Sequence, residues 1–257
     1  MSWDLGAGLD GRVALVTGAS GAIGRHVAAA LASAGARVVA VDLDEAAVRA
    51  VVAGLPGNGE RHVALSADLR DLDAIEQLVE RAIAATGRLD VLAHVAGVIK
   101  RVADLDDVTP ADWELQEQVN LRATFFLGRA CARAMRAHGD GGAIVNFTSQ
   151  GWQSGGFGGS AVYAATKGGV VSLSRGMART FAADRIRVNC VAPGMVDSPM
   201  LRNGLPAAQI DGFTDQIPLG RFARPDELAG AVVFLASRHA SYITGATLDV
   251  SGGLLMY

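Results

Sequence analysis

Two residues with acid–base chemistry stand four positions apart, Tyr163 and Lys167, in the segment Tyr-Ala-Ala-Thr-Lys. On a helix this spacing places both side chains on one face, within mutual reach. A phenol with its ordinary pKa of about 10 is a poor base at neutral pH. A neighbouring ammonium favours the phenolate, so the pair can transfer a proton to or from a bound hydroxyl. By itself the same spacing also fits a solvated helix face.

A third candidate, Ser149, directly follows the apolar run Ala143–Thr148 and precedes Tyr163 by fourteen residues. A serine hydroxyl that donates to an oxygen gaining negative charge stabilises that charge. Thr148 offers a second hydroxyl at the same place, and the two remain alternatives. The glycine-rich stretch between Ser149 and Tyr163 is predicted to be a loop.

A glycine turn lies between the first apolar strand and an alanine-rich helix. In this position the backbone N–H groups of such a turn can approach a pyrophosphate at a helix N-terminus. The turn therefore predicts a dinucleotide site, although a tight turn that needs glycine for backbone reasons is the alternative. The expected contacts are Gly18, Ser20, Gly21, Ala22, Ile23 and Gly24.

Asp42 ends the second predicted strand, where a carboxylate can accept hydrogen bonds from the adenosine ribose. The same carboxylate would repel a 2′-phosphate, and no Lys or Arg stands within the turn before Gly24. NAD(H) is therefore expected rather than NADP(H). The alternative role for Asp42 is the N-cap of the next helix, a position that Asp44 can also fill.

Strands and helices alternate along the whole chain, which predicts an α/β fold. Helices of this length between strands imply right-handed crossovers and a parallel sheet covered on both faces. We expect one Rossmann-type, doubly wound domain over residues 1–257, with about seven strands. The expected strands are Val13–Thr17, Arg37–Val41, His62–Ser66, Val91–Val95, Ala143–Thr148, Arg187–Val191 and Ala246–Val250. The expected helices are Ile23–Ala34, Glu45–Val52, Leu72–Thr86, Pro110–Ala137, Ala161–Phe181 and Pro225–Ser237.

Composition argues against several classes of protein. The 23 basic and 26 acidic residues give a net charge of −3 without any basic tract, so nucleic acid is not an expected partner. No apolar stretch is long enough to span a bilayer, and the first residues lack a signal-peptide pattern. Two distant cysteines and five scattered histidines predict a cytoplasmic protein without a catalytic metal.

From the glycine turn to the carboxyl end, the sequence resembles the short-chain dehydrogenase/reductase family in its compact branch. The family turn reads T-G-x-x-x-G-x-G; Thr17, Gly18 and Gly24 match it, whereas Ala22 replaces the middle glycine and Gly21 precedes it. That spacing is closer to the family's extended, epimerase-like branch. After the fourth strand the family shows Asn-Asn-Ala-Gly, and this chain has His94-Val95-Ala96-Gly97. His94 is expected to be structural, with a catalytic acid as the alternative.

The resemblance implies roles for further residues. It implies that Ser149 hydrogen-bonds the substrate oxygen, that Tyr163 transfers the proton and that Lys167 tunes Tyr163 and binds the nicotinamide ribose. It implies that Asn120 holds a water in a proton relay to the lysine, although a plain polar helix residue is the alternative. The cofactor contacts that it adds are Asp68, Leu69, Ala96, Gly97, Pro193, Gly194, Val196 and Ser198.

These features predict an NAD(H)-dependent oxidoreductase that interconverts a small secondary alcohol and a ketone: a sugar, polyol, hydroxy acid or 3-oxoacyl compound. The alternatives are a non-catalytic NAD-sensing protein and an NAD-using epimerase or dehydratase.

Three segments are expected to enclose the substrate, 150–160, 100–104 and 197–219. The expected substrate contacts are Ser149, Gln150, Trp152 and Tyr163. Lys100 and Arg101 are expected to be surface charges, with contact to an anionic substrate as the alternative. The two long helices and the carboxyl end resemble the subunit interfaces of the family. This resemblance implies a homotetramer.

Overall fold

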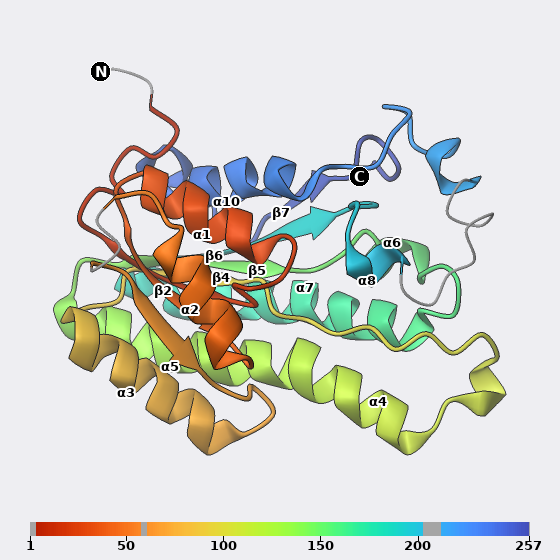
Figure 1. Ribbon diagram of the computed structural model, residues 1–257, viewed down its shortest axis with the longest axis horizontal. Coiled ribbons are helices and arrows are strands. Elements are labelled where there is room, and N and C mark those ends of the chain that lie inside the picture. Colours follow the sequence, from red (N-terminus) through yellow and green to blue (C-terminus); the bar gives the residue numbers. More distant parts are fainter. Residues whose placement is uncertain (1–3, 58–60, 203–211, 257) are drawn as a thin grey trace.

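One parallel sheet of seven strands, in the order β3-β2-β1-β4-β5-β6-β7, forms the centre of the molecule (Figure 1). The computed structural model describes residues 4–57, 61–202 and 212–256. The strand bounds lie within two residues of those predicted. They are β1 (Val13–Thr17), β2 (Arg37–Asp42), β3 (Val63–Ser66), β4 (Val91–His94), β5 (Gly142–Phe147), β6 (Ile186–Pro193) and β7 (Thr247–Val250).

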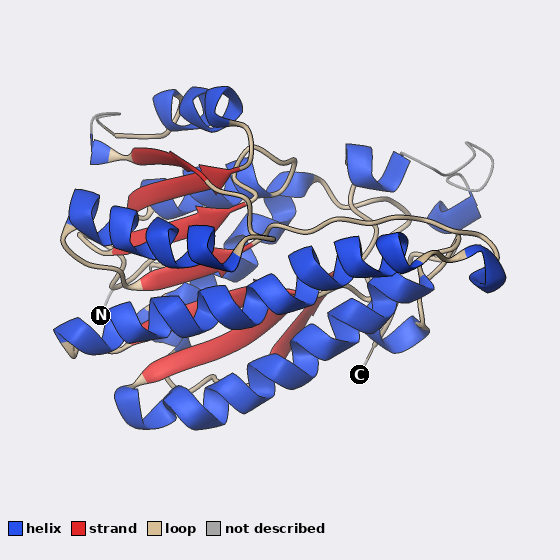
Figure 2. Cartoon of the chain, turned by 90° about the horizontal axis from the view of Figure 1, so that it is seen from below, coloured by secondary structure: helices blue, strands red, loops and turns tan. Residues whose placement is uncertain are grey.

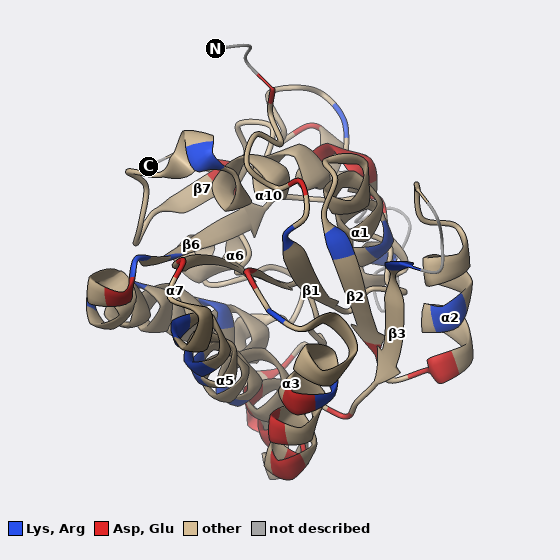
Figure 3. Ribbon diagram, turned by 90° about the vertical axis from the view of Figure 1, so that its left-hand side faces the viewer, with Lys and Arg blue, Asp and Glu red and all other residues tan. Residues whose placement is uncertain are grey.

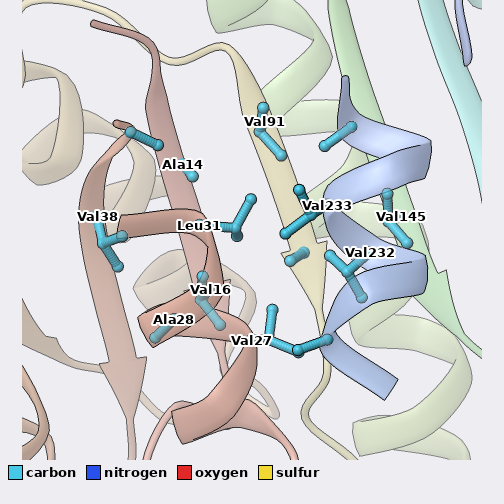
Figure 4. Close-up of a cluster of buried hydrophobic side chains, with 14 of the residues drawn as sticks. Ala14, Val16, Val27, Ala28, Leu31, Val38, Val91, Val145, Val232 and Val233 are labelled. Carbon is cyan, nitrogen blue, oxygen red and sulfur yellow. The ribbon is translucent and has the colours of Figure 1, made fainter. Parts of the chain in front are cut away.

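Helices cover both faces of the sheet, as predicted, because the central strands are apolar on both sides. On one face, Val27 and Leu31 of α1 (Gly24–Ser33) and Val232 of α10 (Ala229–Ala236) pack against Val16 and Val145 (Figure 4). The helix α2 (Glu45–Ala53) contributes to the same core.

The second face is covered by α3 (Leu72–Thr86), α5 (Ala123–His138) and α7 (Ala161–Phe181) (Figure 2). In Figure 3 the ribbon of α3 is red at its acidic residues, and that of α5 is blue at its basic residues. Glu76 of α3 pairs there with Arg129 and Arg133 of α5, so charge complementarity links the exposed sides of these two helices.

The predicted helix Pro110–Ala137 is three segments rather than one. It begins with α4 (Pro110–Gln116), whose N-terminus carries a capping box between Thr109 and Asp112. A π-helical segment, η3 (Glu117–Arg122), follows and leads into α5. The prediction of continuous α-helix was wrong here because the apolar periodicity does not reveal one extra residue within a turn.

Other departures are short. The predicted helix Pro225–Ser237 consists of the 3₁₀ turn η5 (Pro225–Leu228) and α10, since Pro225 starts a tighter first turn. Short helices also occur in segments expected to be irregular. They are η2 (Leu105–Asp107), α6 (Gly151–Ser154), η4 (Ala182–Asp184), α8 (Pro199–Arg202) and η6 (Arg238–Ala240).

The strand order reverses between β1 and β4, which are neighbours although two strands separate them in sequence. The connections leave in opposite directions from this point, so a crevice opens at the carboxyl ends of these strands. The glycine turn after β1, Asp42 at the end of β2 and Gly97 after β4 all lie at this edge.

Candidate active site

A cavity of about 600 Å³ opens at the reversal point between β1 and β4. Gly18 has a φ of 65°, and a Cβ at this residue would lie 2.8 Å from the Ala96 Cα. A Cβ at Gly24 would lie 2.0 Å from the Gly18 carbonyl oxygen. These two positions therefore require glycine. The lining includes Gly18, Ser20, Gly21, Ala22, Ile23, Gly24, Asp42, Asp68, Leu69, Ala96, Gly97 and Ser198.

The N-terminus of α1 faces this cavity without a side-chain cap at Ile23. Within the described residues, the backbone N–H groups of Ala22 and Ile23 donate to no acceptor. Unpaired amides at a helix N-terminus attract anions through their partial positive charge. The Ala22 departure from the family turn leaves these amides in place, so the turn fits a pyrophosphate.

Asp42 stabilises the turn from the neighbouring strand. Its Oδ2 accepts hydrogen bonds from the Ser20 N–H (2.9 Å) and hydroxyl (2.5 Å), and its Oδ1 accepts one from the Leu43 N–H. Asp44, not Asp42, caps α2, with its carboxylate accepting from the N–H groups of Ala46 and Ala47. The alternative role of Asp42 as a helix cap is therefore wrong, and its carboxylate lines the cavity instead.

Asp68 and Leu69 line the far end of the same cavity. The Asp68 carboxylate forms a two-pronged ion pair with Arg70, with Nη2 to Oδ2 at 2.6 Å. The hydrogen bond from Arg70 lowers the pKa of Asp68. Sequence analysis placed this carboxylate correctly in the cavity but missed Arg70 as its partner.

A second cavity, of about 150 Å³, adjoins the first, since Ile23, Val95, Gly97, Ser198 and Met200 line both. It brings together Ser149, Tyr163 and Lys167, which come from the end of β5 and from α7. Within the second cavity, the Thr148 hydroxyl donates to the Lys167 carbonyl at 2.8 Å. Ser149 is therefore the hydroxyl that faces Tyr163.

Burial controls the proton affinity of Tyr163. Desolvation raises the pKa of its phenol to about 12, against the opposing effects of a hydrogen bond from Ser149 and the positive charge of Arg101. The Lys167 ammonium lies 5.6 Å from the Tyr163 ring centroid. The expected lowering of this pKa by Lys167 stays a prediction.

Lys167 is almost fully buried, with 3% of its surface exposed. Its Nζ donates to the Phe147 carbonyl at 2.8 Å. Burial lowers the pKa of Lys167 to about 8, because an ammonium loses hydration in this environment. The side chain is thus fixed between α7 and the end of β5, next to the floor of both cavities.

Asn120 lies in the π-helical segment η3 and is fully buried. Its side chain accepts from the Val98 N–H and donates to the Val98 carbonyl, both at 2.9 Å. It also donates to Thr166, the residue before Lys167. A Cβ on Gly97 would lie 3.2 Å from Asn120 Oδ1 and 3.3 Å from Lys167 Nζ, so these groups meet at the segment after β4.

His94 is buried beneath the cavities, and it belongs to the described lining of neither. Its Nδ1 lies 2.7 Å from the Thr17 hydroxyl of β1, and Thr17 in turn accepts from the Ala96 N–H. Desolvation, followed by the charge of Lys167, lowers the pKa of His94 to about 3. The imidazole is neutral at ordinary pH, which supports the structural role over the catalytic one.

The segment after β6 forms another wall of the smaller cavity. Pro193, Gly194, Val196 and Ser198 all line it, and Ser198 donates to the Val196 carbonyl.

Of the two predicted substrate contacts in the glycine loop, only Gln150 lines the cavity. Trp152 lies outside the described lining, with its ring 6.0 Å from the Arg175 guanidinium. The predicted enclosing segment 197–219 includes residues 203–211, which lie outside the described part of the chain.

Several lining residues were not predicted as substrate contacts. Arg101 lines the cavity, contrary to the expectation of a surface charge, and Lys100 is exposed as expected. No local signal identifies the apolar residues, because loops distant in sequence assemble them. They are Ile99, Phe147 and Met195. Met200, Leu201 and Phe213 also line the cavity, and they lie within the predicted enclosing segment 197–219.

The two cavities together combine a glycine turn at an uncapped helix N-terminus, the buried pair Tyr163 and Lys167, and a largely apolar chamber. The family model described as enoyl-(acyl carrier protein) reductase matches residues 18–255, which contain every one of these groups. The chain is a member of the short-chain dehydrogenase/reductase family. Dehydrogenases of this family use a nicotinamide cofactor, either NAD or NADP.

Curated relatives match this short-chain dehydrogenase/reductase over almost its whole length. It is 38% identical to D-threitol dehydrogenase of Mycolicibacterium smegmatis, over 98% of this chain and 96% of the relative. It is 42% identical to cis-4-hydroxycyclohexanecarboxylate dehydrogenase of Sinomonas cyclohexanicum, over 94% and 96%.

A solved structure, described as a short-chain alcohol dehydrogenase from Sinorhizobium meliloti 1021, superposes with a TM-score of 0.91. It is 35% identical, over 98% of each chain. The short-chain dehydrogenase/reductase described here has no helix, among the residues with described structure, that is long and apolar enough to cross a membrane. In the same ranges no cluster of three or more His, Cys, Asp or Glu is placed to hold a metal ion.

Proposed function

We propose that this protein is an NAD(H)-dependent dehydrogenase that interconverts a small secondary alcohol and its ketone. The supporting observation is the placement of Ser149, Tyr163 and Lys167 around one cavity that adjoins the dinucleotide crevice. Oxidation of an alcohol requires one group that accepts the hydroxyl proton and another that accepts a hydride from the carbon bearing that hydroxyl. The smaller cavity provides the proton acceptor, and the adjoining crevice provides a place for the hydride acceptor. We take residues 1–257 to form one domain.

Tyr163 is the general base for oxidation and the general acid for reduction. Ser149 donates to the substrate oxygen and lowers the pKa of Tyr163. Lys167 donates to the Phe147 carbonyl and Asn120 to the Val98 carbonyl, which fixes both side chains at the floor of the site. Their proposed role is to relay protons to and from Tyr163. A bound nicotinamide supplies or accepts the hydride.

NAD(H) rather than NADP(H) is the proposed cofactor. The amides of Ala22 and Ile23 would hold the pyrophosphate, and the Asp42 carboxylate retains acceptor capacity for the ribose hydroxyls. A 2′-phosphate would meet the same carboxylate and be repelled. Pro193, Gly194, Val196 and Ser198 would contact the nicotinamide end, and Asp68 and Leu69 the adenine end.

The test is a panel of secondary alcohols with NAD⁺, followed by absorbance of NADH. The relatives make a polyol such as D-threitol and a cyclic hydroxy acid the first compounds to include. Tyr163→Phe is expected to reduce turnover by at least about 1000-fold, while NADH still binds. Turnover that survives this substitution would remove Tyr163 from its role.

The same panel separates the two alternative functions. A non-catalytic NAD sensor would bind NADH without producing it from any alcohol. An epimerase or dehydratase would transform its substrate without net accumulation of NADH. Net reduction of NAD⁺ at the expense of an alcohol is expected only of a dehydrogenase.

A homotetramer is the proposed assembly. Large apolar side chains are exposed on the outer elements, among them Trp113 of α4, Phe125 of α5 and Tyr242 near β7. Exposed aromatic residues are typical of subunit interfaces. Light scattering coupled to size-exclusion chromatography is expected to give four times the 26.5 kDa chain mass, and a monomer mass would contradict the proposal.

A further inference from the structure

The smaller cavity contains a positively charged group, Arg101, that has no acidic partner among the described residues. Arg101 lines the cavity, and its charge acts on the Tyr163 phenol. It forms no ion pair with any Asp or Glu in the described ranges, and the described lining contains no acidic residue. Partly buried arginines normally have an anionic partner, because desolvation of an unpaired charge is costly.

The three guanidinium nitrogens of Arg101 differ in their hydrogen bonding. Nη1 donates to the carbonyls of Phe157 (3.0 Å) and Gly158 (3.4 Å), which fixes the guanidinium against the glycine loop. Nε is buried without a hydrogen-bond partner, and Nη2 has none among the described residues. Because Nε is closed off from solvent, Nη2 is the donor that remains for a carboxylate in the cavity.

The remaining walls are chiefly apolar and aromatic. Ile99, Phe147 and Met195 line the cavity, as do Phe157 and Phe213, whose ring centroids are 6.1 Å apart. The cavity, of about 150 Å³, also has to take the nicotinamide end of the cofactor, so it suits only a compact substrate. Its apolar walls offer few partners for the many hydroxyls of a polyol.

We propose that Arg101 binds the carboxylate of the substrate, and that the substrate class is a compact, apolar hydroxy or oxo carboxylate, such as a ring that carries one alcohol and one carboxylate. The carboxylate lies against Arg101, the ring against the aromatic walls and the alcohol against Ser149 and Tyr163. The position of the substrate's alcohol rests on the proposed dehydrogenase activity, whereas the position of its carboxylate rests on Arg101 alone.

The activity test compares 4-hydroxycyclohexanecarboxylate with its carboxamide, which has the same shape without the charge. The native protein is expected to prefer the carboxylate in kcat/KM, and Arg101→Gln to reduce this preference about 10- to 100-fold. Taking the ratio cancels any effect of Arg101 on Tyr163 or on the loop, since both substrates share it. Arg101→Lys is expected to retain an intermediate preference.

Lys100→Gln is the matched control, because it removes the same charge from an exposed neighbour outside the cavity lining. It is expected to retain the native preference. If the native protein does not distinguish acid from amide, or if Arg101→Gln and Lys100→Gln change the ratio equally, the assignment of Arg101 is overturned. A preference for polyols over the carboxylate would overturn the substrate class.

A binding experiment separates this inference from the proposed activity. Cyclohexanecarboxylate lacks the reacting hydroxyl, so its affinity for the NADH-loaded protein, measured by calorimetry, does not depend on turnover. Binding that Arg101→Gln weakens about 10-fold or more and Tyr163→Phe leaves intact supports the carboxylate site even if no alcohol is oxidised. Absence of binding to the folded native protein overturns it.

Discussion

The imidazole Nδ1 of His94 on β4 lies 2.7 Å from the hydroxyl of Thr17 on β1, in the registered pair that joins these strands at the reversal point. On the other side, His94 is paired in register with Asn146 on β5. His94 Nε2 and Asn146 Oδ1 are both buried without a hydrogen-bond partner. We expect the tautomer with its proton on Nε2, because Nδ1 can then accept from the Thr17 hydroxyl.

This burial predicts a loss of stability in acid. The pKa of His94 falls from 6.5 to about 3 on folding, so its contribution is complete above pH 6.5 and is lost as pH falls toward 3. At pH 4 the free energy of unfolding should be about 3 kcal/mol lower than at pH 7 from this residue alone. Urea titrations of native protein and His94→Asn at both pH values measure the difference. Parallel pH dependence in the two proteins would show that His94 is not the titrating group.

Ser149 is expected to shift the pH profile of oxidation. Since its hydrogen bond lowers the pKa of Tyr163, Ser149→Ala should raise that pKa above the native value of about 12. The rising limb of log kcat/KM should then move to higher pH, and the rate at pH 8 should fall about 100-fold. Thr148→Ser, which keeps the hydroxyl bonded to Lys167, serves as the control. A limb unmoved in Ser149→Ala would contradict the assigned donation.

Asp42 is expected to determine the choice of cofactor through its charge. Asp42→Asn keeps an acceptor for the Ser20 N–H but removes the repulsion of a 2′-phosphate. The ratio of kcat/KM for NAD⁺ to that for NADP⁺ should fall about 10- to 100-fold. Asp44→Asn removes the same charge from the cap of α2 and should leave the ratio unchanged. Equal ratios in the two variants would argue against selection by Asp42.

Gly97 is expected to tolerate no side chain without loss of activity. A methyl group there would lie 3.2 Å from Asn120 Oδ1 and 3.3 Å from Lys167 Nζ, so both groups must move by a few tenths of an ångström. Gly97→Ala should lower kcat about 10-fold, with a modest change in thermal stability. Gly230→Ala, whose Cβ meets no described atom within 4 Å, is the control and should retain full kcat. A Gly97→Ala enzyme with native kcat would show that this contact is not critical.

The sequence predicted those features that are determined locally. The turn from Thr17 to Gly24 and the pair of Tyr163 and Lys167 depend on short spacings within one or two elements, and the structure brings them to one edge of the sheet. The burial of Arg101 could not be predicted, because it depends on the carbonyls of Phe157 and Gly158, more than fifty residues away. Composition and local spacing contain no information on such a contact.

The π-helical turn at Glu117–Arg122 has an evolutionary consequence. It holds one residue more than an α-helical turn would, and each residue rotates a helix by about 100°. Deleting a single residue there would therefore rotate the helix on one side of the turn relative to the other side. Asn120 could then still contact Val98, or Leu127 could still pack in the core, but not both. Chain-length variation among functional descendants should consequently avoid this turn.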